Sequence, residues 1–414
     1  MRQALASALR HLHEQGLWVF LGRVYLSGGS LLSSILLARL MTQNDMGTYS
    51  LLRSGIGMVA VLSLPGVFEV LIRNIPQGHY GIYGPLFRKR IGAAVLASLA
   101  FIGYAVCVND VLSTAQVISL AVIATLLPLY FSSQMYVAAY QAQMQFRQLS
   151  AIYIGRTTVQ LLGYLVPFLV FKAVFPALAC MIAIMTVYHV WNHRKMHRDL
   201  LAKANGEQYL SLGLMRDAGM ISLFSILPAV TENIDKVFIE GRIGLAQLAV
   251  YSIGMTIGSA INAFFKPFLN SINAKLVHQV PGPQHYALVV VVGTVLGGAV
   301  TLALPYLVPF LYGEAYSASV PMAAIVLMSM GLFFGKTLYF NLAMFNKDRK
   351  LTVVYASNVT TAIGAIGYMV AVTWLVRDND TLLLWFAGTY PLKNFLSIFT
   401  LWIFPKLLGK GLDG

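Results

Sequence analysis

The stretch TENIDKVFIEGRIGLAQLAVYSIGMTIGSAINAFFKPFLN, residues 231–270, shows how the chain is organised. It opens with a polar cluster at the end of an apolar run, crosses a short link and continues as a second apolar run. In this second run the pair Tyr251-Ser252 precedes Pro267. In the first half of the chain Tyr49-Ser50 precedes Pro65 at the same spacing, again just after a polar link. Two similar halves are typical of a transporter built from a duplicated helical bundle.

The composition is that of a polytopic membrane protein. Of the 414 residues, 58% are hydrophobic and only 11% are charged, and long apolar runs recur along the whole length. The formal net charge of +14 does not indicate nucleic acid as a partner, because membrane proteins concentrate lysine and arginine in their cytoplasmic loops. Cys107 and Cys180 lie in apolar runs, so neither a disulfide framework nor a metal site is expected.

The apolar runs predict an all-α integral membrane protein with about twelve transmembrane helices in two pseudo-symmetric six-helix lobes. The longest connection divides the chain into an N-terminal lobe (1–192), a cytoplasmic linker (193–217) and a C-terminal lobe (218–414). No outer loop is long enough to hold an extramembrane domain, so no catalytic residues are expected. The spans are expected near residues 17–41, 48–72, 91–108, 113–140, 149–171, 174–192, 218–240, 246–273, 286–311, 319–345, 351–376 and 381–405.

Basic residues orient the chain in the membrane. Most lysines and arginines of the connections fall on one side, including the cluster Arg88-Lys89-Arg90, and we expect this side to be cytoplasmic. Both termini are then cytoplasmic. The opposite side holds only Lys172, Lys236, Arg242 and Arg377.

Several basic residues fall inside the predicted spans, where a charge costs about 2.5–3.5 kcal/mol on insertion scales. Arg39 lies near the end of its span and is expected to have a structural role. The deeper ones are candidates for binding an anionic substrate, because guanidinium and ammonium groups match phosphate oxygens. They are Arg23, Arg53, Arg156, Lys266, Lys336 and Lys393.

Polar side chains share helix faces with these cations. Tyr153, Arg156, Gln160 and Tyr164 recur at three- and four-residue spacing in the fifth span, so Tyr153 and Gln160 join the candidate substrate site. Similar stripes accompany Arg23, Lys266 and Lys393. The stripes predict a water-filled central cavity between the lobes, and the alternative is polar packing between neighbouring helices.

Carboxylates are few in the spans. Glu232, Asp235 and Glu69 are candidates for a proton or Na⁺ site that couples transport to an ion gradient. The alternative for Glu232 and Asp235 is a local ion pair with Lys236 or Arg242 that secures a helix end. No cofactor is expected: the histidines show no metal-ligand spacing, and there is no glycine-rich phosphate loop.

Several short motifs are spread along the chain: Ala38-Arg39-Leu40-Met41, Asp45-Met46-Gly47-Thr48-Tyr49, Pro65-Gly66, Ile72-Arg73-Asn74, Asp235-Lys236-Val237-Phe238-Ile239, Val250-Tyr251-Ser252 and Phe310-Leu311-Tyr312-Gly313 before Tyr316. They resemble motifs of the bacterial polysaccharide flippases of Wzx type, within a superfamily of multidrug exporters, oligosaccharidyl-lipid flippases and lipid II flippases.

The resemblance implies a bacterial inner-membrane flippase for O-antigen or exopolysaccharide repeat units. Its substrate would be an undecaprenyl-diphosphate-linked oligosaccharide, moved to the periplasmic leaflet by alternating access, with membrane lipid and the polysaccharide polymerase machinery as partners. Within the same superfamily the alternatives are a cation-coupled multidrug exporter and a lipid II flippase, although the latter group usually has two further spans. A glycan polymerase or ligase would need a large outer loop, which this sequence lacks.

Overall fold

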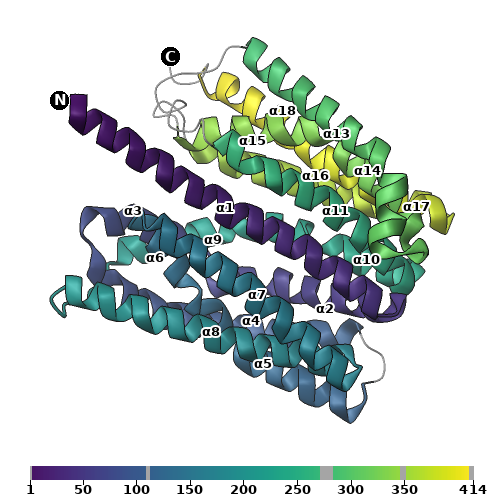
Figure 1. The fold of residues 1–414 in the computed structure, drawn as a ribbon, viewed down its shortest axis with the longest axis horizontal. Coiled ribbons are helices and arrows are strands. Elements are labelled where there is room, and N and C mark those ends of the chain that lie inside the picture. The colour runs from purple at the N-terminus through teal and green to yellow at the C-terminus, as the bar shows by residue number, and fades with distance from the viewer. Residues whose placement is uncertain (1, 109–111, 271–282, 346–350, 410–414) are drawn as a thin grey trace. The chain divides into compact units, whose positions relative to one another are not determined.

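The computed structural model describes residues 2–108, 112–270, 283–345 and 351–409, and all regular secondary structure in these ranges is helical (Figure 1). The chain forms two compact units. The first comprises Met1–Ser30 and Leu52–Ile226, and the second comprises Leu31–Leu51 and Leu227–Gly414. Three helices therefore contribute to both units: α1 (Arg2–Leu40), α2 (Gln43–Val59) and α9 (Leu212–Thr231).

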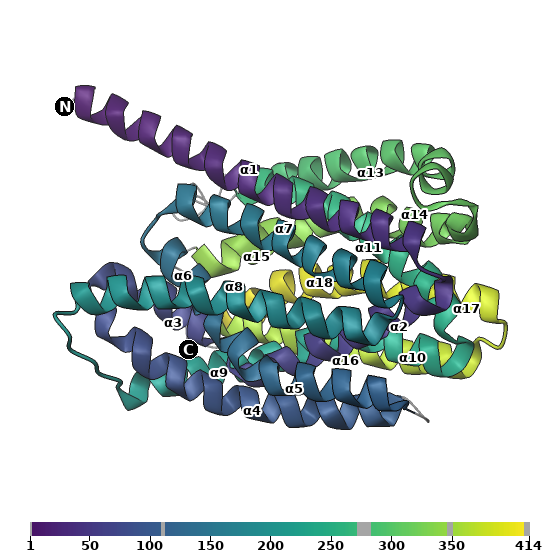
Figure 2. The same cartoon turned by 60° about the horizontal axis from the view of Figure 1, so that its bottom comes forward.

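The first unit is built around four long helices, α4, α5, α7 and α8, which lie side by side (Figures 1 and 2). Its core also takes in buried residues of α3 and α6. Besides parts of the shared helices, its elements are η1 (Ala60–Ser63), α3 (Val67–Asn74), η2 (Ile75–Gln77), η3 (Tyr80–Ile82), α4 (Tyr83–Val108), α5 (Thr114–Ser133), α6 (Met135–Ala142), α7 (Phe146–Phe171) and α8 (Val174–Lys203).

The second unit pairs α11 with α14, α13 with α15, and α16 with α18. Small residues let its helices approach closely, as at Gly254, whose Cα faces the backbone of Ser319 and Ala323. Besides parts of the shared helices, its elements are α10 (Ile234–Ile243), α11 (Leu245–Asn270), α13 (Pro283–Tyr312), η4 (Glu314–Ser319), α14 (Val320–Met328), α15 (Met330–Phe345), α16 (Leu351–Leu375), α17 (Asn379–Ala387) and α18 (Thr389–Gly409).

By length and apolar composition, nine helices of the described residues can cross a membrane, or up to eleven if two bent pairs each count as one span. One pair joins Gln43–Ser63 to Val67–Gln77 with a bend of 54°, and the other joins Glu314–Met328 to Met330–Ala343 with a bend of 41°. The predicted twelfth span, 381–405, coincides with α17 and α18, which are interrupted at Gly388, and it is not among these eleven.

The first bend is explained by the residues at the break itself and by a contact from another helix, α4. Leu64 adopts a left-handed conformation with φ 56°, and Pro65 has no backbone N–H to continue the helix. The Arg90 side chain donates from Nε to the Ser63 carbonyl at 2.9 Å, and its guanidinium lies 4.3 Å from the centre of the Phe68 ring. Arg90 therefore satisfies a carbonyl that the break leaves open.

Arg90 corrects one expectation from the sequence. We expected it in a connection before the span at 91–108, but α4 already begins at Tyr83, and Arg90 lies inside this helix with 4% of its surface exposed. Its neighbours Arg88 and Lys89 are exposed. The helix begins early because residues before the apolar run, such as Tyr83 and Leu86, are themselves buried in the core of the first unit.

Residues 193–217, predicted as a linker, belong to three structural segments. They form the last turns of α8, an irregular stretch from residue 204 to 211 and the first turns of α9. Met196 and Leu200 are buried in the core of the first unit, so this end of α8 is held by packing.

The repeated Tyr-Ser and proline spacing does not correspond to a repeated bend. The helix breaks around Pro65, whereas α11 runs without interruption through Pro267 to Asn270. Proline alone therefore does not fix the bend, since the left-handed Leu64 and the Arg90 contact occur only in the first of the two places.

Candidate functional site

In the first unit, α7 presents a polar face and an apolar face, as predicted. Tyr153 and Tyr164 are buried, and Arg156 and Gln160 are partly buried on the same face. Large apolar side chains occupy the exposed side of the same helix: Leu162, Val166, Leu169 and Val170. The polar stripe is thus turned away from the side that suits lipid.

Arg156 lies among aromatic and neutral groups. It is within electrostatic range of Tyr136, Tyr188 and His189, and in the described part of the chain it forms no ion pair. The Tyr136 hydroxyl and His189 Nδ1 are 2.8 Å apart, and the Tyr188 hydroxyl donates to the Ile152 carbonyl at 2.9 Å. These bonds fix the side chains that surround the guanidinium.

The other candidate cations lie in different places. Arg53 is exposed on α2 in the first unit, and Lys336 is partly buried on α15 in the second unit. Lys393 belongs to a stripe on α18 whose members Ser397 and Thr400 are buried, while Phe395, Phe399 and Trp402 of the same helix are exposed. The side chains of Arg23 and Lys266 lie outside the described residues, although their helices, α1 and α11, are described.

The second unit buries a carboxylate at the break between α9 and α10. Asp235 is 5% exposed, and its Oδ2 accepts a hydrogen bond from the Tyr251 hydroxyl at 2.6 Å. Its Oδ1 accepts from the backbone N–H of Lys236 at 3.0 Å and lies 3.3 Å from Lys236 Nζ. The ion pair with Lys236 was the structural alternative for Asp235, and the Tyr251 bond comes in addition to it.

The three candidate coupling carboxylates differ in their surroundings. Glu232, three residues before Asp235, is exposed. Glu69 is partly buried in the first turn of α3 and belongs to the first unit. Of the three side chains, Asp235 is the one whose charge the fold encloses.

A second set of polar groups in this unit surrounds Lys393. Its Nζ donates to the carbonyl of Thr231, which the end of α9 leaves without a helical partner. Asn262 on α11 donates to the Tyr390 hydroxyl at 2.9 Å, while the other amide atom of Asn262, Oδ1, is buried without a partner among the described residues. The α9 break, α11 and α18 thus share one polar interior.

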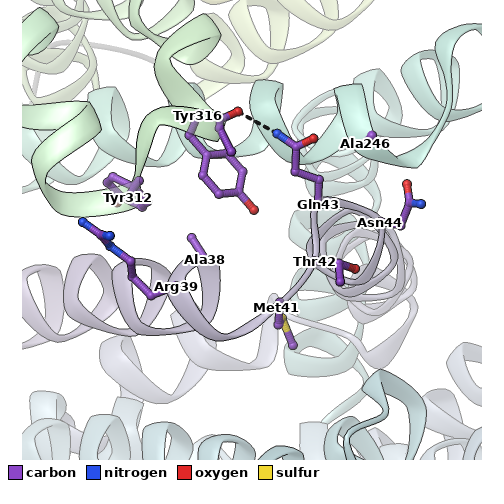
Figure 3. A pocket seen from close by; sticks show the side chains of 10 residues that line it. Ala38, Arg39, Met41, Thr42, Gln43, Asn44, Ala246, Tyr312 and Tyr316 are labelled. Carbon is purple, nitrogen blue, oxygen red and sulfur yellow. Dashed lines mark hydrogen bonds between the residues drawn. The ribbon is translucent and has the colours of Figure 1, made fainter.

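The second unit also contains a cavity of about 550 Å³ that sequence reasoning did not identify (Figure 3). It lies where the end of α1 and the start of α2 meet the end of α13 and η4. The lining residues are Ala38, Arg39, Met41, Thr42, Gln43, Asn44, Ala246, Tyr312, Ala315 and Tyr316.

Hydrogen bonds hold the two sides of this cavity together. Arg39 donates from Nε to the Leu311 carbonyl at 2.9 Å and from Nη2 to the Phe310 carbonyl, so it caps the last turn of α13. The hydroxyls of Ser34 and Tyr312 are 2.7 Å apart, and Gln43 donates to the Ala315 carbonyl at 2.6 Å. Arg39 thus has the structural role expected for it. The only feature of the sequence that pointed to this cavity is that its two sides, residues 38–41 and 310–316, both carry flippase-like motifs.

Comparison with solved structures identifies the fold. A mutant of the VcmN MATE transporter of Vibrio cholerae matches with a TM-score of 0.63 and 13% identity, covering 98% of each chain. The eukaryotic MATE transporter AtDTX14 matches with a TM-score of 0.59 and 11% identity over 95% of each chain. A MATE transporter in complex with MaD5 matches with a TM-score of 0.60 and 10% identity, again over 95% of each. The chain has the MATE-like transporter fold in two lobes.

Comparison with protein families adds the biological context. No protein with a curated description matches the sequence. The family model described as "Polysaccharide biosynthesis protein" matches residues 36–276, which is more than half of the chain. Both this family and the fold are those of membrane transporters and not of enzymes. The chain therefore belongs to the polysaccharide biosynthesis protein family.

Proposed function

We propose that the protein is a flippase that moves an undecaprenyl-diphosphate-linked oligosaccharide from the cytoplasmic to the periplasmic leaflet of the bacterial inner membrane. The family supports a role in polysaccharide synthesis, and the fold supports transport by alternating access between two lobes. On this proposal the polyprenyl tail stays in the lipid, and the glycan passes on to the polymerase machinery.

The observation that carries the proposal is the environment of Arg156. Among the described residues it forms no ion pair, and it shares its helix face with Tyr153 and Gln160. A charge inside a span costs about 2.5–3.5 kcal/mol and is retained where a partner or a wet cavity offsets the cost. A diphosphate is such a partner, since its oxygens fit the planar fork of a guanidinium. The phenol and amide beside it suit the hydroxyls of a sugar.

Analysis of lipid-linked sugars tests this proposal. Deletion of the protein should cause a diphosphate-linked oligosaccharide to accumulate on the cytoplasmic face of the membrane. Arg156→Ala should behave like the deletion, and Arg156→Lys should recover part of the export because it keeps the charge but loses the fork. Hydrogen bonds to charged groups contribute about 1.5–3 kcal/mol, so we expect export to fall roughly 10- to 150-fold in Arg156→Ala.

Arg377→Ala is the matched control, because Arg377 is an exposed arginine between α16 and α17. It should export normally at the same membrane abundance. Wild-type surface glycan in cells that carry Arg156→Ala would contradict the role of Arg156, and absence of any accumulated lipid-linked sugar in the deletion strain would contradict the function itself.

A cation-coupled multidrug exporter is the second candidate function. The similar solved structures are MATE transporters, and Asp235 is a buried carboxylate of the kind that binds a proton or a monovalent cation. The same deletion strain separates the candidates. If the protein is a drug exporter, the strain should be more sensitive to cationic drugs while its lipid-linked sugars stay unchanged. If it is a glycan flippase, lipid-linked sugars should accumulate while drug sensitivity stays unchanged. If it is a lipid II flippase, the peptidoglycan precursor should accumulate.

A further inference from the structure

The cavity between residues 38–44 and 312–316 lies within the second unit, and hydrogen bonds hold its walls in place. Its two walls are tied by the bonds from Arg39 to the end of α13 and by the bond from Gln43 to Ala315. Its volume of about 550 Å³ lies within the range of small-molecule sites, about 300–1,000 Å³. Figure 3 shows Tyr316 with its hydroxyl directed towards the space between Ala38 and Gln43.

The lining offers neutral hydrogen-bonding groups. The Tyr316 hydroxyl is buried and has no hydrogen-bond partner among the described residues. A buried hydroxyl without a partner destabilises the protein, and a ligand that forms the missing hydrogen bond removes this penalty. Gln43 uses its Nε2 for the Ala315 carbonyl, which leaves its amide oxygen as an acceptor. Asn44 adds a second side-chain amide to the lining.

Charge narrows the class of ligand. The lining contains no carboxylate, so it offers nothing to pair with a cationic drug. Its one cation, Arg39, already donates to two backbone carbonyls, so it is not free to clamp a diphosphate. Ala38, Met41, Ala246 and the tyrosine rings supply apolar surface between the polar groups. Alternating hydroxyl and C–H surface is the chemistry of a sugar ring.

We infer that this cavity binds a neutral sugar residue of the translocated glycan, as a subsite separate from the Arg156 region. The inference rests on the proposed flippase function. On the orientation predicted from the basic residues, the connections that form the cavity lie on the periplasmic side. The subsite would therefore hold the glycan as it leaves the protein, and the Tyr316 hydroxyl would bond to a sugar hydroxyl.

Binding of free glycan to the purified full-length protein tests the inference. The probe is the oligosaccharide that mild acid releases from the host's lipid-linked sugars, which carries neither the lipid nor the diphosphate. Calorimetry should detect binding to the wild type. Tyr316→Phe removes a single oxygen and should weaken binding about two- to tenfold, as expected for the loss of a neutral hydrogen bond.

Tyr306→Phe is the control, since Tyr306 on α13 is 80% exposed and its loss of a hydroxyl should leave binding unchanged. Equal affinity in Tyr316→Phe and the wild type, or no binding of the glycan to the wild type, would overturn the subsite and leave a cavity filled by water alone. Either result is distinct from failure of the proposed function, which shows itself as no accumulation of lipid-linked sugar in the deletion strain.

Discussion

At the scale of single residues, two carboxylates in one short segment have different environments. Asp235 is enclosed by Tyr251 and Lys236, whereas Glu232, about one turn earlier, is exposed. An enclosed carboxylate that exchanges its partners can bind and release a proton or a monovalent cation during a transport cycle. Glu232 is exposed in this structure, and an exposed carboxylate is already solvated, so we expect its charge to have less influence on the energy of the cycle.

We therefore predict that Asp235→Asn lowers ion-driven export at least about tenfold while the protein still inserts. Asparagine keeps the shape and the hydrogen bond from Tyr251, but it loses the charge that pairs with Lys236. Uptake of lipid-linked glycan by inverted vesicles under an imposed proton or Na⁺ gradient measures the effect. Glu232→Gln is the control and should transport normally. Equal gradient dependence in both variants would exclude Asp235 as the coupling residue.

The residues of the candidate site could be predicted only in part. The stripe of Arg156 on α7 follows from helical periodicity, and the structure places its members on one partly buried face. The bond from Tyr251 to Asp235 and the capping of Thr231 by Lys393 join residues of different helices, which periodicity cannot pair. Arg90 was expected in a connection because the apolar run begins just after it, whereas in the structure it is buried and donates to the carbonyl of Ser63 at a distant break.

At the scale of elements, the positions of the long helices could be predicted, but not all of their breaks could. Apolar runs mark where α5, α7 and α8 cross, because each run is long enough to span the hydrocarbon core. The interruptions at Gln134 and Ser329 carry neither glycine nor proline, so no local signal announces them. The bend at Leu64 differs from them, because Pro65 follows it directly and Arg90 of another helix donates to the carbonyl of Ser63.

Close helix contacts give a prediction at this scale. A Cβ placed at Gly297 on α13 would overlap the carbonyl oxygen of Leu327 on α14, whereas a Cβ at Gly298 would meet nothing within 4 Å. Gly297→Ala should therefore destabilise the protein by about 1–3 kcal/mol, the usual cost of overpacking. Gly298→Ala should be neutral or stabilising by about 0.5–1 kcal/mol, because alanine favours a helix.

Thermal unfolding of both variants in the same detergent measures the difference, with the wild type as reference. The pair shares one helix and one type of substitution, so membrane insertion and helix propensity affect both alike. If the two alanine variants unfolded at the same temperature, the approach of α13 to α14 would not depend on a missing side chain.

At the scale of the whole molecule, family and fold answer different parts of the functional question. The fold is shared with MATE transporters at identities of 10–13%, so it establishes the transporter architecture but not the cargo. The family adds polysaccharide synthesis. The direction of transport depends on how the chain lies in the membrane, which the asymmetric distribution of basic residues predicts.

Single cysteines test that orientation in a background where Cys107 and Cys180 are replaced by alanine. Glu207 is exposed between α8 and α9, next to the basic end of α8, and Asn379 is exposed at the start of α17. A membrane-impermeant maleimide should label Asn379→Cys in intact cells and should label Glu207→Cys only after the inner membrane is opened. A permeant maleimide should label both, which controls for reactivity. The reverse labelling pattern would place the basic connections outside the cell, although the energetics of membrane insertion favour lysine and arginine on the cytoplasmic side. It would also invert the proposed direction of glycan movement.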